Sequence, residues 1–300
     1  MKRETSSTNN DSAYLKRLDL AVVFGHDLMG RLNIRRSGQA LPRANRYLLS
    51  NRIYHVTHRC HDRSFLLKFA KDRNDYRRLA MEMSGTHGIS ILNYCLTSNH
   101  IHILLEAEDK ESVSRFMQDL AGTFALHYNR RKKRSGGYWE GRYHATMIDS
   151  GPYLWDCLQY IDLNMVRAGV VKHPEEWPWT GWQEIMGLRK RYCLIDQKKL
   201  IAWTGHKDLE QFREHYVQDL TNRLEHCILQ RESQWTEAVA VGTEVFIKSV
   251  TEQLPDRRRW QIEETTIGRS AGSILREPTP AYMRFSPPKN AAKTSQSPMK

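Results

Sequence analysis

The order of apolar patterns between residues 47 and 169 constrains the fold of this chain more than any other feature. "YLLSNRIYHVTHRC" (47–60) alternates apolar and polar residues with the two-residue period of a strand. "DRNDYRRLAMEMSGTHG" (72–88) predicts a helix that ends at its glycines. "ISILNYCLT" (89–97) and "HIHILLE" (100–106) predict two further strands, which a short polar turn connects.

The next three segments complete the pattern and add one element. "KESVSRFMQDLAGTFALHYNRRKKR" (110–134) predicts a helix with one apolar face, and "YWEGRYHATMID" (138–149) predicts a fourth strand. "GPYLWDCLQYIDLNMVRAG" (151–169) predicts a last helix, with Pro152 in its first turn and Gly169 at its end. The order strand-helix-strand-strand-helix-strand is that of a ferredoxin-like sheet. We therefore predict an α+β fold, a ferredoxin-like β-α-β-β-α-β domain with an added helix.

The expected domain boundaries follow changes in composition. Residues 46–188 form the predicted domain, and a tryptophan-rich segment, "HPEEWPWTGWQEIMG", closes it. Residues 1–45 are expected to be a partly disordered N-terminal extension, and residues 189–265 a small helical C-terminal region. Residues 266–300 are rich in Pro, Ser and Lys, which predicts a disordered basic tail.

The charge of the chain favours a polyanionic partner. The formal net charge is +12 and the pI is about 9.5. Such a surplus points to nucleic acid first and to an acidic membrane second, although many basic proteins bind neither. No apolar run reaches the length of a membrane span, and the N-terminus has no apolar core of a signal peptide. We therefore expect a cytoplasmic protein that does not bind membranes.

The five cysteines are widely spaced and include no CxxC pair. This pattern argues against a disulfide framework and against a zinc site built on thiolates. Reduced, buried thiols are the expected state, as in a cytosolic protein. The residues are Cys60, Cys95, Cys157, Cys193 and Cys227.

Two histidines in the third predicted strand are candidate metal ligands. His100 and His102 are two residues apart, so both side chains point to the same face of the strand. Ile101 and Ile103 then face the opposite way, into the core. Two neutral imidazoles on one face form half of a site for a divalent metal. The alternative is a solvent-exposed face of an amphipathic strand, and the pair alone does not decide between the two.

The last predicted helix offers a tyrosine beside an amide. Tyr160 and Asn164 are four residues apart and hence neighbours on the helix surface. They lie opposite an apolar stripe, on a polar stripe that an exposed helix would also carry. A phenol beside a metal that polarises a phosphate can attack phosphorus. The polar stripe consists of Tyr153, Asp156, Tyr160, Asn164 and Arg167, and the apolar stripe of Leu154, Leu158, Ile161 and Met165.

These motifs together resemble those of a known family. "NHIHIL" resembles the histidine-hydrophobic-histidine (HUH) motif of single-tyrosine transposases, and "YIDLNMVRAGVV" resembles their catalytic helix. Residues 47–185 are most similar to the REP-associated tyrosine transposases, within the IS200-like superfamily. Two positions depart from the pattern: Met165 stands where proline is usual, and "RCHDR" lacks a glycine that often follows the arginine. Neither departure touches a candidate ligand or nucleophile.

The resemblance implies a reaction and its residues. Residues 46–188 would be an HUH single-tyrosine transposase domain, in which His100, His102 and Asn164 hold Mg²⁺ or Mn²⁺ and Tyr160 is the nucleophile. The enzyme would cleave single-stranded DNA near a hairpin, leaving a 5′-phosphotyrosine and a free 3′-hydroxyl, without a nucleotide cofactor. It would act as a monomer or homodimer associated with the nucleoid.

Cationic and aromatic residues are candidates for DNA contacts. A cationic run ends the helix at 110–134, and three aromatic residues follow it, where they would stack unpaired bases or pack in the core. His55, His58 and His144 are expected to pack or to contact DNA, and Glu140 to lie on the surface. The predicted DNA-binding residues are Arg130, Arg131, Lys132, Lys133, Arg134, Arg142 and Arg167; the aromatic residues are Tyr138, Trp139 and Tyr143.

Several alternatives remain open at this point. Tyr153 is a second possible nucleophile, although it lies at the start of its helix. Arg257, Arg258 and Arg259, next to Trp260, offer a second contact to DNA. The chain would otherwise be a non-catalytic DNA-binding regulator derived from a transposase, or an RNA-binding ferredoxin-like module that needs no metal. A covalent adduct with a hairpin oligonucleotide separates the enzyme from both.

Overall fold

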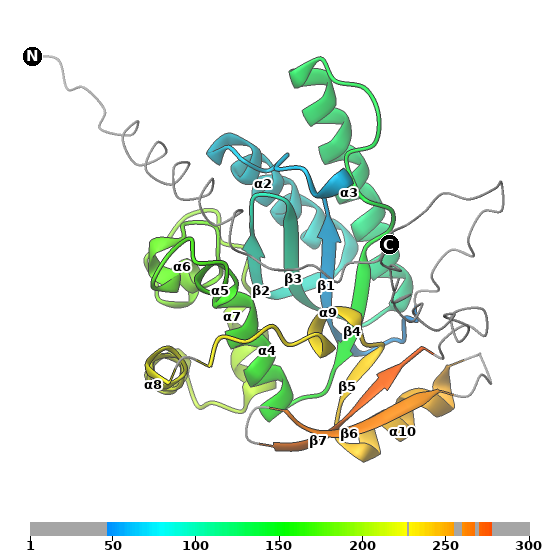
Figure 1. Cartoon of the computed structure of the whole chain (residues 1–300), viewed down its shortest axis with the longest axis vertical. Helices are drawn as coiled ribbons and strands as arrows, with labels where there is room; N and C mark the ends of the chain where they lie inside the picture. The colour runs from blue at the N-terminus through cyan, green and yellow to red at the C-terminus, as the bar shows by residue number, and fades with distance from the viewer. Residues whose placement is uncertain (1–46, 227, 255–259, 268–269, 278–300) are drawn as a thin grey trace, which may run out of the picture.

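The computed structural model describes residues 47–226, 228–254, 260–267 and 270–277 (Figure 1). The expected N-terminal extension lies outside the described residues, as do Arg257 to Arg259 and most of the expected tail. Within the described ranges, no helix combines the length and the apolar character that a bilayer span requires.

The predicted ferredoxin-like core is present. Strands β2, β3, β1 and β4 are neighbours in this order, and every pair among them is antiparallel. Helix α2 follows β1, and helix α3 follows β3, so the chain order is β-α-β-β-α-β. The α+β prediction is therefore confirmed. The bounds are β1 Arg52–Arg59, α2 Ala70–His87, β2 Ile89–Leu96, β3 His100–Ala107, α3 Lys110–Lys132 and β4 His144–Ile148.

Local chemistry sets the ends of these helices. The side chain of Asp109 accepts a hydrogen bond from the Glu111 backbone N–H and caps α3. Gly88, with φ of 64°, ends α2 in the left-handed conformation that glycine adopts without strain. The predicted apolar face of α3 is buried, and it includes Val113, Phe116, Leu120 and Phe124.

The fourth strand is shorter than predicted. The pattern predicted strand structure over 138–149, but β4 covers only His144–Ile148. Gly141 has φ of 74°, which breaks the extended conformation before β4 begins. The aromatic residues of this segment fold back onto β1, where Trp139 forms an isolated bridge with Cys60.

The predicted helix 151–169 is divided in two. Helix α4 (Pro152–Asp162) ends at Leu163, whose φ of −77° and ψ of 1° turn the chain before the short α5 (Asn164–Arg167). At this break the buried carboxylate of Asp162 accepts hydrogen bonds from Tyr216 and from the Trp182 backbone N–H. These are tertiary contacts, which helical periodicity does not reveal.

The polar stripe of α4 is buried, contrary to an exposed helix face. The side chain of Asp156 pairs with Arg223, and the Tyr153 hydroxyl donates to the Ala271 carbonyl. Both partners belong to the C-terminal region, which covers the side of α4 that the core leaves open.

The C-terminal region is not only helical, which corrects the prediction for residues 189–265. It adds β5, β7 and β6 to the same sheet, with β5 parallel to β4. Strand β7 also lies within the expected tail at 266–300. The sequence did not predict β5 and β6 because neither shows an alternation of apolar and polar residues. Strand β5 has only three residues, and six of the seven residues of β6 are exposed. The bounds are β5 Ala240–Gly242, β6 Gln261–Ile267 and β7 Ser270–Arg276.

Short helices connect and flank these strands. Helix α8 (Leu209–Glu225) packs beside α4, while α9 (Gln234–Glu237) precedes β5 and α10 (Glu244–Gln253) follows it (Figure 1). The remaining elements are η1 His61–Arg63, η2 Pro174–Glu176, α6 Trp182–Ile185 and α7 Gln197–Thr204.

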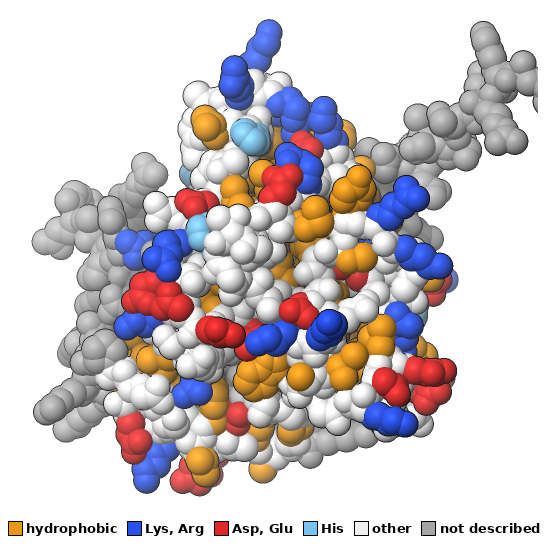
Figure 2. Space-filling view, turned by 180° about the vertical axis from the view of Figure 1, so that it is seen from behind, with side chains coloured by type: hydrophobic (Ala, Val, Ile, Leu, Met, Phe, Trp, Pro, Cys, Tyr) orange, Lys and Arg blue, Asp and Glu red, His pale blue; other side chains and the backbone are white. Residues whose placement is uncertain are grey.

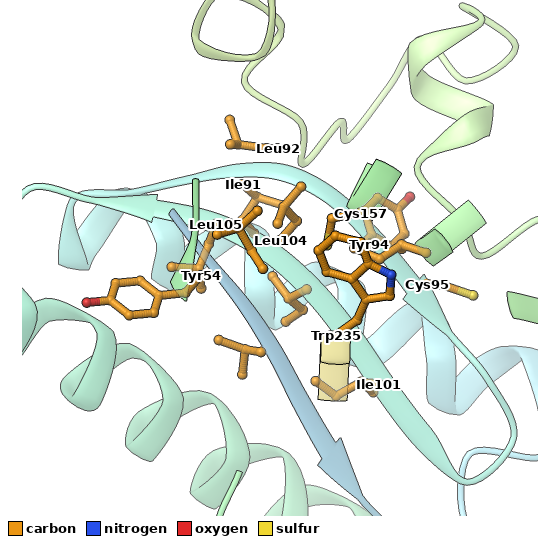
Figure 3. Close-up of a cluster of buried hydrophobic side chains, with 14 of the residues drawn as sticks. Tyr54, Ile91, Leu92, Tyr94, Cys95, Ile101, Leu104, Leu105, Cys157 and Trp235 are labelled. Atoms are coloured by element: carbon orange, nitrogen blue, oxygen red, sulfur yellow. The ribbon is translucent and has the colours of Figure 1, made fainter. Parts of the chain in front are cut away.

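The core joins the C-terminal region to the first four strands. Figure 3 shows Trp235 of α9 in one buried cluster with Ile101 and Leu104 of β3 and Cys157 of α4. Cys60, Cys95 and Cys157 are free and buried, as predicted, whereas Cys193 is exposed. The two regions therefore share one apolar interior.

Candidate active site

Three histidines meet on one face of the sheet. His100 and His102 of β3 point the same way, as their spacing requires, and their ring centroids are 4.9 Å apart. His55 of β1 joins them, with its ring stacked 5.0 Å from that of His102. In the strand register Thr57 lies opposite His102, so His55 is its diagonal neighbour.

Each ring has defined partners. His55 Nδ1 lies 2.7 Å from the Trp235 carbonyl oxygen, and His55 Nε2 lies 2.9 Å from His102 Nδ1. His102 Nε2 lies 2.9 Å from the side-chain amide of Asn164, at the start of α5. His100 Nδ1 contacts the Asn99 Oδ1 at 2.7 Å and the Thr97 hydroxyl at 3.0 Å.

Burial keeps the histidines neutral. It lowers the pKa of His55 and of His100 to about 3, with further lowering by nearby cationic groups. The pKa of His102 lies well below its usual value for the same first reason. Neutral imidazoles offer lone pairs to a metal at neutral pH.

The donor set fits a divalent cation. His102 Nε2 and the Asn164 amide are 2.9 Å apart, and adjacent ligands of an octahedral Mg²⁺ are roughly 3 Å apart. The amide oxygen takes the place of the nitrogen when the side chain flips. No three His, Cys, Asp or Glu side chains in the described part of the chain group as a metal site. A cation here would therefore need Asn164 and oxygen ligands from water or a phosphate.

Tyr160 of α4 lies against these histidines. Its ring centroid is 6.2 Å from that of His102 and 6.0 Å from that of His55. The side chain is 4% exposed, and burial raises its pKa, an effect that Arg167 partly offsets. The Arg167 guanidinium lies 3.9 Å from the centre of the tyrosine ring.

Arg167 is a candidate ligand for an anion at this site. Burial lowers its pKa, which the neighbouring Tyr160 counteracts. Its Nη2 is buried and has no hydrogen-bond partner among the described residues. A buried donor of this kind costs free energy unless a partner binds it. The guanidinium therefore lies where a phosphate oxygen near Tyr160 would satisfy it.

Tyr153, the second possible nucleophile, lies elsewhere. Its hydroxyl donates to the carbonyl of Ala271 in β7, and its ring packs against Gly272. Strand β7 therefore occupies this phenol, whereas Tyr160 lies beside the histidines.

The side chains of the cationic run differ in their contacts. Arg131 pairs with the buried Asp72, and Arg134 donates to Asn129 and to the Gly137 carbonyl. Arg130, Lys132 and Lys133 are exposed at the C-terminal end of α3, which forms the top of the molecule in Figure 2. Arg142 is also exposed.

The aromatic residues after the run pack inside the protein. Tyr138 and Tyr143 are buried. Trp139 is half-buried, stacks on His58 at 4.2 Å and donates to the Ala121 carbonyl. Of the two readings left open for these residues, the structure therefore supports packing.

Sequence reasoning missed the part that His55 and Trp235 play in this site. His55 was expected only to pack or to contact DNA, and the segment that contains Trp235 (235–250) was expected only to pack or to recognise the hairpin. The alternation of β1 places His55 on a defined face, but only the register with β3 brings it to His102. Nothing in the sequence links Trp235 to either strand.

The chain is similar to known transposases over this region. The family described as "Transposase IS200 like" matches residues 49–164. A protein of Haemophilus influenzae named as a REP-associated tyrosine transposase is 24% identical over 119 residues, which are 36% of this chain and 68% of that protein.

Two solved structures are similar to the chain as well. One is a REP-associated tyrosine transposase bound to a REP hairpin, with a TM-score of 0.41 and 18% identity over 50% of this chain and 89% of that one. The other is described as a transposase from Deinococcus radiodurans, with a TM-score of 0.28 and 15% identity over 34% of this chain and 83% of that one. The family match covers the HUH pair, Tyr160 and Asn164. Residues 49–164 are therefore the part of the chain that is similar to the IS200-like transposase family.

Proposed function

We propose that this protein cleaves and rejoins single-stranded DNA near hairpins, with Tyr160 as the nucleophile and a divalent metal held by His100, His102 and Asn164. One observation carries the proposal. His102 Nε2 lies 2.9 Å from the Asn164 amide while the Tyr160 ring lies 6.2 Å from the His102 ring. Side chains from β3, α4 and α5 thus lie close together, which supports these proposed roles.

The reaction that fits this geometry is a transesterification. The Tyr160 oxygen would form a bond to phosphorus as the bond from phosphorus to the 3′ oxygen breaks. The phenol proton passes to water, and the departing 3′ oxygen takes up a proton. Attack of a 3′-hydroxyl on the 5′-phosphotyrosine reverses the step. Because the covalent link retains the phosphodiester energy, no nucleotide cofactor is needed.

Each residue of the site would have a separate role in this reaction. Arg167, against the Tyr160 ring, would stabilise the phenolate and a phosphate oxygen. His100 and His102 would present neutral nitrogens to the cation, and Asn164 an amide oxygen. A bound Mg²⁺ or Mn²⁺ would polarise the phosphate.

The test is a covalent adduct on a denaturing gel, with a hairpin oligonucleotide and Mn²⁺. We expect the wild type to form the adduct and Tyr160→Phe to lose it while still binding the oligonucleotide, because the substitution removes one oxygen atom. Tyr153→Phe is the matched control and should retain the adduct. An adduct of unchanged yield in Tyr160→Phe would refute the assignment of the nucleophile.

A second candidate function is a DNA-binding regulator without turnover. The 4% exposure of Tyr160 favours it, because DNA cannot reach a phenol that is covered in this way. The exposed cations at the end of α3 would serve such a protein equally well. An oligonucleotide that binds but never forms an adduct, with either Mg²⁺ or Mn²⁺, would support this reading over the first.

The cellular setting is part of the proposal. The match of residues 49–164 to the transposase family and the net charge of +12 support hairpin DNA as the partner and the nucleoid within the cytoplasm as the place of action. We propose a monomer or homodimer, which size-exclusion chromatography with and without hairpin DNA would distinguish.

A further inference from the structure

A continuous chain of hydrogen bonds runs from the C-terminal region to the candidate metal ligands. It passes from the Trp235 carbonyl through both nitrogens of His55 to His102 Nδ1, with separations of 2.7 Å and 2.9 Å. His102 Nε2 then faces the Asn164 amide at 2.9 Å. His55 is 0% exposed and His102 is 2% exposed, so water does not compete for these contacts.

The Trp235 carbonyl determines which ring nitrogen of His55 and of His102 carries a proton. A carbonyl oxygen only accepts hydrogen bonds, so His55 Nδ1 must donate to Trp235. A neutral imidazole has one N–H, which leaves His55 Nε2 as an acceptor. His102 Nδ1 must therefore carry the proton and donate to His55. The lone pair of His102 then resides on Nε2, the nitrogen that faces Asn164.

The anchor of this chain is itself held in place. The Thr146 hydroxyl lies 3.2 Å from the Trp235 carbonyl oxygen and 2.9 Å from that of Ala238. The Trp235 indole donates to Glu232 at 2.9 Å, and Arg223, which pairs with Asp156 of α4, lies 3.7 Å from Glu232. Helix α9 is thereby tied to β4, to α8 and to α4.

We propose that His55 is a positioning residue that holds His102 in the Nδ1–H tautomer, and that α9 completes the metal site through the Trp235 carbonyl. This inference rests on the proposed function for the identity of the metal ligands. The C-terminal region would then be part of the catalytic apparatus and not only an appendage. Partners of metal-ligating histidines typically change metal affinity by about 10- to 100-fold when they are removed.

The first test reads the tautomer directly in the metal-free protein. Two-bond ¹H–¹⁵N correlation spectra distinguish a protonated Nδ1 from a protonated Nε2. We expect His102 to be protonated at Nδ1 in the wild type. A wild-type spectrum with the proton on Nε2 would overturn the inference without any variant, and this readout does not depend on whether the protein cleaves DNA.

The second test compares His55→Phe with a matched control. Phenylalanine keeps a planar ring but accepts no hydrogen bond from His102, while Thr146 still satisfies the Trp235 carbonyl. We expect the His102 proton to move to Nε2 and Mn²⁺ affinity, measured by calorimetry, to fall about 10- to 100-fold. His144→Phe is the control, because His144 contacts Ala238 of the same segment but is not bonded to His102.

If His55→Phe does not fold, the conservative variant His55→Gln still tests the proposal. In His55→Gln the amide can donate to Trp235 and accept from His102, so the wild-type tautomer and most of the Mn²⁺ affinity should remain. Equal affinity in the wild type and His55→Phe, or loss of the tautomer in His55→Gln, would overturn the proposal. Should the wild type bind no Mn²⁺ and form no adduct, the proposed function fails, and the tautomer measurement still decides the role of His55.

Discussion

At the scale of single residues, burial decides the chemistry of this site. His55, His100 and His102 lie close enough that two positive charges among them would repel. His55 and His102 are buried and His100 is half-buried, so little water is left to stabilise a charge. All three are therefore held neutral, in the form that binds metals. The same burial raises the pKa of Tyr160, so the phenol stays protonated until an anion or cation at the site changes its surroundings.

This neutrality should make the protein sensitive to acid. Burial lowers the pKa of His55 from 6.5 to about 3 in the folded state, so the stability it contributes is present above pH 6.5 and is lost as the pH falls toward 3. Between pH 7 and pH 5, this residue should account for about 2 kcal/mol of the decrease in the free energy of unfolding. Urea denaturation of the wild type and His55→Phe at both pH values measures this contribution.

Subtracting the pH dependence of His55→Phe from that of the wild type removes the contribution of groups such as Asp162 that both proteins share. Burial raises the pKa of Asp162 to about 6, and this carboxylate acts in the opposite direction, because its contribution is lost as the pH rises. It is present in both proteins and cancels in the difference. Equal pH dependence in the wild type and His55→Phe would contradict the expectation.

At the scale of elements, the sequence predicts what periodicity encodes and misses what tertiary contacts impose. The alternation in "HIHILLE" and the apolar face of α3 specify β3 and α3, because the period of each element matches one buried face. The break at Leu163 and the partnership of His55 with His102 depend on residues far away in the chain. The candidate ligands and nucleophile were predicted from motif resemblance. The contact between His55 and His102 depends on the register between β1 and β3, which the sequence does not reveal.

The end of α3 carries a prediction about DNA affinity. Lys132 and Lys133 are exposed, so replacing both by Gln should weaken binding of a hairpin oligonucleotide and reduce its salt dependence, by about 1 to 2 in the slope of log K against log salt. Fluorescence anisotropy at several salt concentrations measures both quantities. Lys248→Gln on α10, at the opposite end of the molecule in Figure 1, is the control for loss of charge alone.

Arg131, in the same run, should behave differently. It pairs with Asp72, whose side chain is 0% exposed, so Arg131→Gln leaves a buried carboxylate without its cation. We expect this variant to lower the free energy of unfolding, whereas the Lys132 and Lys133 substitutions should not. The expectation is contradicted if Arg131→Gln weakens DNA binding as much as the two lysine substitutions do and leaves the free energy of unfolding unchanged. Arg131 would then contact DNA in the same way as Lys132 and Lys133.

At the scale of the whole molecule, one sheet connects the transposase-like core to the C-terminal region. Strand β5 pairs with β4 on one side and with β7 on the other, so the sheet continues without interruption beyond residue 188. The chain segment that ends in β5 also carries Trp235, which lies against Tyr160 with ring centroids 6.2 Å apart. The short segment that places β5 in the sheet therefore also places Trp235 beside Tyr160.

Gly242 offers a way to test this coupling in the full-length chain. A Cβ atom at this position would lie 2.4 Å from Asp149 Cβ and 2.6 Å from the Phe246 ring, so β5 must shift to admit even a methyl group. Gly242→Ala should lower the free energy of unfolding by about 1 to 3 kcal/mol. Because the shift moves α9 as well, it should also weaken Mn²⁺ binding.

Gly122→Ala is the control. Gly122 lies inside α3 with open space around it, so this substitution should stabilise the protein by up to about 1 kcal/mol. A loss of stability in Gly242→Ala with unchanged Mn²⁺ affinity would show that the C-terminal strands support the fold but not the site.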